Sequence, residues 1–357
     1  MENIVWFILN NIKGLGNKTL FKIYKECPDL TLENINSYQD NLTKIIKKSS
    51  ILDAIFNNEQ IELNKINTKK MIENHLNNNI YPIDISSDYY PVILRNIDDP
   101  PIVLYAKGNK ELLKDNARVA FIGTREPTKK GYLAAKKLAR LFANNGYTIV
   151  SGLAVGIDTA GHEGALEATN GKTIAVLASG LDSIYPAENK HLAQQILTNN
   201  GLLLSEYPLG ARAFKSAFVQ RDRIQSGLSL AVCPVQTPIE GGTQHTIKFS
   251  INQNRVLFCP SPQESESIKA TQGIYQLIDF NRALVINGPQ DYEIIINAIK
   301  QKAKEFDVEV PEQFINYNSI QLPKDIEVEL DNLLNLCKTN NISYDQIMKA
   351  IKNKLND

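Results

Sequence analysis

Residues 118–158 read RVAFIGTREPTKKGYLAAKKLARLFANNGYTIVSGLAVGID, and this stretch decides the fold. Short apolar runs at 118–122 and 147–150 predict two strands, and the apolar spacing over 132–144 predicts a helix between them. Glycine-containing loops follow both strands. A strand–helix–strand unit of this kind indicates a parallel sheet with helices on its faces, in which ligands bind beyond the carboxyl ends of the strands.

The same alternation of short strands and helices continues to about residue 286. The sequence therefore predicts an α/β fold in which a parallel sheet forms the core of the chain. The further strands that apolar runs predict are residues 173–177, 202–205, 230–235 and 256–259.

Helical segments are expected on both sides of this core. Residues 1–80 are rich in Asn, Lys and Ile with apolar residues at helical spacing, which predicts a small helical domain. Four prolines between residues 81 and 101 predict an extended lead-in to the core, which spans 81–290. Residues 291–357 are charged and predict a short helical C-terminal region, with helices at 325–336 and 343–355. These two helices could form part of a helix-turn-helix. The favoured alternative is that they pack against the rest of the chain or mediate oligomerisation.

The composition narrows the class of protein. The 357 residues allow two or three domains, and Lys+Arg 39 balance Asp+Glu 39, which excludes a globally basic binder but not a locally basic groove. The four cysteines and four histidines stand without disulfide or metal-ligand spacing, so we expect reduced thiols, no metal and no cofactor. Because no apolar stretch reaches the roughly 18–20 residues of a membrane span and the start has no basic leader, we expect a soluble cytoplasmic protein.

The loop after the first strand, Gly123-Thr124-Arg125, has the features of a phosphate site. A glycine lets the backbone approach a ligand, the following helix offers N–H groups to an anion, and Arg125 adds a planar guanidinium. An ordinary tight turn with a solvated arginine is the alternative. The second loop begins with Ser151-Gly152 and again places small residues before a helix.

Asp158 and His162 lie one turn apart at the start of that next helix. A helix cap and a buried, hydrogen-bonded histidine form the favoured interpretation, ahead of an acid–base pair. Neither loop matches GxxxxGKS/T, and no GxGxxG follows the first strand, so ATP hydrolysis and standard dinucleotide binding have little support.

A third cluster combines cations with an aromatic ring, since Lys215, Phe218, Arg221 and Arg223 stand within nine residues. Cations beside a ring that can stack on a base are typical of single-stranded nucleic-acid binding. The alternative is a helix start with solvated arginines and a core phenylalanine. Residues 118–140 also hold seven cations against Glu126 alone, which predicts a local anion-binding face.

Near the N-terminus, residues 12–20 (IKGLGNKTL) resemble the hairpin of a helix-hairpin-helix. Such a glycine-rich turn can present backbone N–H groups to a DNA phosphate. In the alternative interpretation, the hairpin only packs against the rest of the chain.

Taken in order, the motifs resemble those of the DprA/Smf family of DNA-processing proteins over residues 85–290. The resemblance rests on a series of short motifs in the expected order rather than on any one of them. The series is Tyr90-Pro91, Pro100-Pro101, Leu104-Tyr105, Lys107-Gly108, Gly123-Thr124-Arg125, Ser151-Gly152-Leu153-Ala154, Gly156-Ile157-Asp158, His162, 173–177, Gly180, Tyr185-Pro186, Ser205-Glu206 and 221–229.

The resemblance implies an extended Rossmann-like core, a SAM-like helical domain at residues 1–80 and no catalytic residue. It further implies a protein that binds single-stranded DNA without strong sequence preference, protects incoming strands and dimerises through the Rossmann-like core. Such a protein loads a RecA-type recombinase in natural transformation. The residues that the resemblance assigns to DNA and phosphate binding are Gly123, Thr124, Arg125, Ser151, Gly152, Lys215, Phe218, Arg221 and Arg223.

The chain departs from the family pattern at several positions, which indicates a divergent member. Asp222 stands where the family has asparagine, and the other departures are Gln225-Ser226, Gln236, Gly241-Gly242-Thr243 and Ser261. The alternative functions on the same fold are a nucleotide-binding sensor of a bacterial defence system and a nucleotide hydrolase. A hydrolase would need a positioned carboxylate, for which Glu240, Glu206 and Asp158 are the candidates.

Overall fold

The central strands form where short apolar runs predict them, within the residues that the computed structural model describes (3–263 and 268–315). They pair in parallel, in the order β6-β5-β4-β3-β7-β8, and so confirm the predicted parallel core. The six strands are β3 (Arg118–Ile122), β4 (Thr148–Ser151), β5 (Thr173–Leu177), β6 (Leu202–Ser205), β7 (Ala231–Pro234) and β8 (Val256–Pro260).

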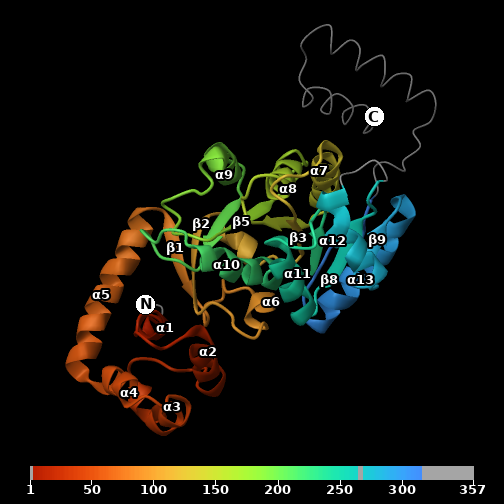
Figure 1. The fold of residues 1–357 in the computed structure, drawn as a ribbon. Helices are drawn as coiled ribbons and strands as arrows, with labels where there is room; N and C mark the ends of the chain where they lie inside the picture. The colour runs from red at the N-terminus through yellow and green to blue at the C-terminus, as the bar shows by residue number, and fades with distance from the viewer. Residues whose placement is uncertain (1–2, 264–267, 316–357) are drawn as a thin grey trace, which may run out of the picture. The chain divides into compact units, whose positions relative to one another are not determined.

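Further strands extend this core at both edges. β9 (Leu284–Ile286) adds in parallel to β8, whereas β1 (Ile80–Asp84) and β2 (Val103–Gly108) are antiparallel, with β2 beside β6. The sheet, in the order β1-β2-β6-β5-β4-β3-β7-β8-β9, is therefore mostly rather than wholly parallel (Figure 1). The lead-in expected to be extended contains a short helix, α6 (Val92–Arg95), which starts directly after Pro91 because proline suits a helix start.

The alternation of side chains along β3 explains why helices cover both faces of the sheet. Val119 and Phe121 are buried against one face, and Ala120 and Ile122 against the other, since successive side chains of a strand point to opposite faces. The helices that contribute to the first face are α7 (Lys129–Asn144), α8 (Ile157–Leu166) and α13 (Tyr292–Glu305), and α9 (Lys190–Thr198) packs beside α8. The helices on the second face are α10 (Lys215–Gly227), α11 (Thr243–Asn252) and α12 (Ile268–Asp279) (Figure 1).

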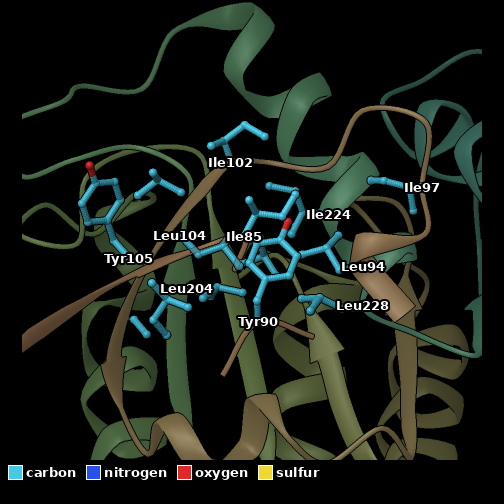
Figure 2. Packing of buried hydrophobic residues seen from close by; sticks show 14 of the residues in the cluster. Ile85, Tyr90, Leu94, Ile97, Ile102, Leu104, Tyr105, Leu204, Ile224 and Leu228 are labelled. Carbon is cyan, nitrogen blue, oxygen red and sulfur yellow. The ribbon is translucent and has the colours of Figure 1, made fainter. Parts of the chain in front are cut away.

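The position of α10 is set by apolar packing near its C-terminal end. Figure 2 shows Tyr90 and Leu94 together with Ile224 and Leu228 in the core on this face. The Tyr90 hydroxyl donates to the carbonyl oxygen of Pro101 at 2.6 Å, so its polar atom is satisfied within the core. The first turns of α10 consequently extend to the edge of the sheet where the parallel strands end.

The N-terminal residues are helical, as predicted, and share one core with the sheet. Trp6 is fully buried in the same cluster as residues of β2 and β6, and α1 and α5 contact β2 and β1. The helices are α1 (Val5–Asn10), α2 (Asn17–Glu26), α3 (Gln39–Ile45), α4 (Ser49–Phe56) and α5 (Asn58–Asn77). Short 3-10 helices are η1 (Ile35–Tyr38), η2 (Lys110–Leu113), η3 (Ala187–Asn189) and η4 (Pro289–Asp291).

The helices predicted at 325–336 and 343–355 lie outside the described residues, and the domain boundaries at 80 and 290 stay predictions. Among residues 3–263 and 268–315, none of the helices has both the length and the apolar character that a membrane span requires. The same residues hold no group of three His, Cys, Asp or Glu side chains placed to bind a metal ion.

Candidate functional site

Two hollows lie side by side where the parallel strands end, and they are formed by the loops after β3, β4, β5 and β7 together with α10. We call them hollow A, of about 740 Å³, and hollow B, of about 710 Å³. Hollow A is also lined by residues 182–188 and Lys190, and hollow B by residues 122–124, Asp158, Lys215, Val219, Asp222, Gln225, Pro238, 241–243, His245 and Thr246. The residues common to both are Arg125, Ala154, Phe218 and Arg221.

An aromatic and cationic ridge separates the two hollows. The guanidinium of Arg125 lies 5.8 Å from the centroid of the Phe218 ring, and the Tyr185 ring lies 5.5 Å from the same ring at an interplanar angle of 60°. Arg125 is exposed and Phe218 is half-buried, so the ring both packs and remains accessible. Lys215, also exposed, stands at the first position of α10 beside hollow B.

Arg221 is a buried cation that reaches both hollows. Its Nη1 donates to the carbonyl oxygen of Val176 at 3.1 Å and lies 3.9 Å from the Asp158 carboxylate, and its Nε lies 3.3 Å from Asp222. The guanidinium occupies the space beside Gly152, where an added Cβ would lie 1.2 Å from Nη1. A side chain at position 152 would therefore displace the Arg221 guanidinium.

Asp158 holds the loop after β4 rather than capping α8. Its carboxylate accepts hydrogen bonds from the backbone N–H groups of Gly152 at 3.0 Å and Ala154 at 3.4 Å. The cap position is taken by Gly156, whose φ of +86° suits glycine, so the predicted role of Asp158 as the cap is wrong. Burial raises the pKa of Asp158, while Arg221 and the two N–H groups oppose that rise.

His162 is a buried structural histidine. Thr173 donates its hydroxyl proton to Ile149 O at 2.8 Å, so the His162 Nδ1–H donates to Thr173 Oγ1 at 2.7 Å. Burial and the charge of Arg221 lower the pKa of His162 to about 3, which keeps the ring neutral. This geometry agrees with the favoured interpretation and leaves no acid–base pair between His162 and Asp158.

Asp222 places a carboxyl group in the wall of hollow B. It is 8% exposed, and the Gln225 amide, oriented with its nitrogen towards Asp222, donates to its Oδ1 at 3.1 Å. Burial raises the pKa of Asp222 to about 6, with Arg221 opposing the rise and Asp158 adding to it. The carboxyl group of Asp222 therefore affects the charge of the hollow itself.

Arg223 does not join the other predicted site residues. It is 1% exposed and forms ion pairs with Glu206 and, at 3.7 Å, with Asp99, and it lines neither hollow. The reason is helical geometry, because side chains two positions apart on a helix point about 200° apart. The Glu206 carboxylate also accepts from the Asn17 side chain of α2, so this ion pair lies where the N-terminal helices meet the core.

The side-chain amide of Gln236 holds the loop after β3 in place through two hydrogen bonds with Thr128. The backbone N–H of Thr128 donates to Gln236 Oε1, and Gln236 Nε2 donates to Thr128 Oγ1, both at 2.9 Å. Thr128 also caps α7 by accepting from the N–H of Gly131 at 3.0 Å. The N–H groups of Thr128 and Gly131, at the start of α7, are thus engaged within the protein. Thr124 and Gly123 line hollow B, whereas Ser151 is buried and donates to Phe121 O at 2.6 Å, which makes it a support of the loop.

The predicted seven-cation face is also smaller than expected. Arg118 is fully buried and donates through Nε to Leu228 O at 2.7 Å. Lys136 is paired with Glu163 at 3.0 Å and with Glu167 at 2.8 Å, so neither cation faces a ligand freely.

The carboxylates considered for hydrolysis are not arranged for it. Glu240 is exposed and lines neither hollow, Glu206 is paired with Arg223, and Asp158 is committed to backbone N–H groups. Sequence reasoning missed Tyr185 and Lys190 in hollow A. Tyr185-Pro186 did stand out as a motif, but nothing in its spacing placed it beside Phe218.

Comparison with known proteins agrees with this architecture. The family model described as DNA recombination-mediator protein A matches residues 82–297. Protein Smf of Synechocystis sp. is 36% identical over 230 residues, which make up 64% of this chain and 57% of that protein. The X-ray structure of DNA processing protein A from Streptococcus pneumoniae superposes with a TM-score of 0.64 at 30% identity, over 78% of this chain and 92% of that chain. DNA processing protein A from Helicobacter pylori, whose structure is described as giving insight into its single-stranded DNA binding mode, superposes with a TM-score of 0.53 at 30% identity, over 63% of this chain and 96% of that chain.

Proposed function

Since the chain belongs to the DNA recombination-mediator protein A family, the DprA/Smf proteins, we propose that it binds single-stranded DNA across hollows A and B. The observation that carries this proposal is the ridge of Arg125 and Phe218 between the hollows, with Arg221 beneath it and Lys215 at the rim. A ring beside cations suits a strand whose bases stack and whose phosphates need neutralising.

The charges at the site support this assignment. Arg125 and Lys215 are exposed, and neither forms an ion pair with another residue in the described part of the chain, so both are available to phosphates. Arg221 is balanced by the carboxylates of Asp158 and Asp222 and holds the shape of the site more than it adds net positive charge. We assign no role in DNA contact to Arg223, because its ion pairs bury it away from both hollows.

A binding titration tests the proposal. Fluorescence anisotropy with labelled oligo-dT of 20 nucleotides should show an affinity that falls as salt rises, with a slope of about −0.7 in log K against log salt for each phosphate neutralised. Mononucleotides should bind far more weakly. An oligo-dT affinity that stays constant between low and moderate salt would contradict the proposed site. Tight binding of a mononucleotide would favour the function of a nucleotide sensor.

The wider role follows from the family. We propose that the chain protects incoming single strands and loads a RecA-type recombinase during transformation and recombination, without catalysing a reaction itself. Three described cysteines, Cys27, Cys233 and Cys259, are buried free thiols, which fits a reducing cytoplasm. Strand-exchange assays with a RecA-type protein on coated single strands would test the loading step: no stimulation over the recombinase alone would contradict it.

We also propose a homodimer formed through the Rossmann-like core. An apolar surface on α11 and at the end of α12 supports this, because Phe280 is 62% and Ile251 39% exposed and both line a hollow of about 440 Å³. Light scattering should give twice the chain mass for the wild type and the mass of one chain for Phe280→Asp. A wild-type monomer at micromolar concentration would contradict the proposal.

A further inference from the structure

Tyr185 is an aromatic side chain at the site that the nine predicted contact residues do not include. It is 52% exposed, it lines hollow A, and its ring meets the Phe218 ring edge to face at 5.5 Å. Because the two ring planes are inclined by 60°, one flat base cannot stack on both rings at once. Phe218 borders both hollows, whereas Tyr185 borders hollow A alone.

The loop that carries Tyr185 is fastened at both ends. Asn189 Nδ2 donates to Leu153 O at 2.8 Å and to Thr159 Oγ1 at 2.9 Å, which ties the loop to the β4–α8 segment. At the other end, Asp182 Oδ1 accepts from the backbone N–H of Gly210 at 3.0 Å. A ring presented by a loop held in this way loses little conformational freedom when a ligand stacks on it.

The charges around hollow A distinguish a base from a phosphate. Its wall includes the carboxylates of Asp182 and Glu188, which repel a phosphate placed inside the hollow. Arg221 also lines the hollow but is already paired with Asp158 and Asp222. The cations left for phosphates are Arg125, on the ridge shared with hollow B, and Lys190, at the start of α9. A neutral base inside hollow A, with its phosphates outside against these two cations, satisfies this arrangement.

We propose that hollow A is a second base-binding subsite, in which Tyr185 stacks on the base of a neighbouring nucleotide of the strand held at hollow B. The phosphate between the two nucleotides lies against Arg125 on the ridge. The ligand class is a single strand of at least two nucleotides, and the inference rests on the proposed function. Each hollow, of about 740 and 710 Å³, is within the range of volumes that small-molecule ligands occupy.

The test compares Tyr185→Ala, Tyr185→Phe and the matched control Tyr81→Ala. Tyr81 is 36% exposed on β1 and lines neither hollow. Affinity for labelled oligo-dT of 20 nucleotides is measured by anisotropy over a salt series, and thermal unfolding verifies that each full-length variant folds. Tyr185→Ala should weaken binding by about tenfold or more, which corresponds to about 1.4 kcal/mol, with the salt slope unchanged because no phosphate contact is lost. Tyr185→Phe should restore the affinity, and Tyr81→Ala should bind like the wild type.

Arg125→Ala separates failure of the subsite from failure of the proposed function. If Tyr185→Ala binds within twofold of the wild type while Arg125→Ala weakens binding and flattens the salt slope, the subsite is overturned and DNA binding at the ridge stands. A Tyr185→Ala protein whose salt slope falls along with its affinity would overturn the stacking role. A wild type with no salt-dependent affinity for oligo-dT would overturn the subsite together with the proposed function.

Discussion

Replacing Asp222 by asparagine should tighten single-strand binding, because it removes a negative charge from the wall of hollow B. The carboxylate lies 3.3 Å from the Arg221 Nε, so it neutralises a cation that would otherwise attract phosphate. A phosphate about 8 Å from the carboxylate is repelled by about 2 kcal/mol at an effective dielectric constant near 20. Salt with a Debye length of about 8 Å reduces this to about 1 kcal/mol, or about fivefold in affinity.

The pH dependence follows from the raised pKa of Asp222, about 6 against an ordinary 3.8. DNA prefers the neutral form, so wild-type affinity should be highest below pH 6 and fall as the pH rises through 6 and the carboxyl ionises. The folded protein also holds this proton to a higher pH than the unfolded chain, so stability falls between about pH 3.8 and pH 6 and stays lower above it. Asp222→Asn removes that cost, which is at most about 3 kcal/mol at neutral pH.

The assay is anisotropy with oligo-dT at fixed ionic strength between pH 5 and pH 8, with thermal unfolding of the same samples. Glu240→Gln is the matched control, since it removes an exposed carboxylate that lines neither hollow. We expect the affinity of Asp222→Asn to vary less with pH than that of the wild type and to exceed it by about fivefold at pH 7.5. Equal affinities at pH 7.5 and parallel pH profiles for the two proteins would refute the reasoning.

Three other outcomes follow from the same structure. Gly152→Ala should displace Arg221 and so lower DNA affinity. It should also lower stability by about 1–3 kcal/mol through lost buried hydrogen bonds. The control is Gly242→Ala, whose Cβ would meet nothing within 4 Å and which should change stability little in thermal unfolding. Arg223→Met should cost about 3–5 kcal/mol in chemical denaturation, because its carboxylate partner stays buried; a stability loss under 1 kcal/mol would contradict the proposed structural role. Burial lowers the pKa of His75, whose Nε2 accepts a backbone N–H from the loop after β6, so stability should fall as the pH drops below 6.5, and His75→Gln should reduce that slope in melts between pH 5 and pH 8.

The sequence by itself determined the parts of this fold that depend on short-range pattern. Residues 118–122 are buried throughout, and successive side chains of a strand point to opposite faces, as Val119 and Ala120 do. A strand buried on both faces requires helices on both sides of the sheet. The carboxyl ends of parallel strands lie at one edge of a sheet, so the sequence predicts that the loops beginning at Gly123 and Gly152 lie next to each other. Strands β1, β2 and β9 were not predicted. β1 contains Pro82 and β9 has only three residues, which blurs their local pattern. β2 is placed by antiparallel pairing with β1 and β6, which local spacing does not encode.

The tertiary structure alone decided what each polar residue does within that frame. Arg118 and Arg125 stand on the same strand–loop segment, yet one is buried against Leu228 O and the other lines both hollows. Tyr185 contacts Phe218 because the fold places the loop after β5 next to α10, two segments that are distant in the sequence. The sequence specifies which residues are charged or aromatic. Which residues they contact depends on the tertiary fold, because the contacting partners are far apart in the sequence.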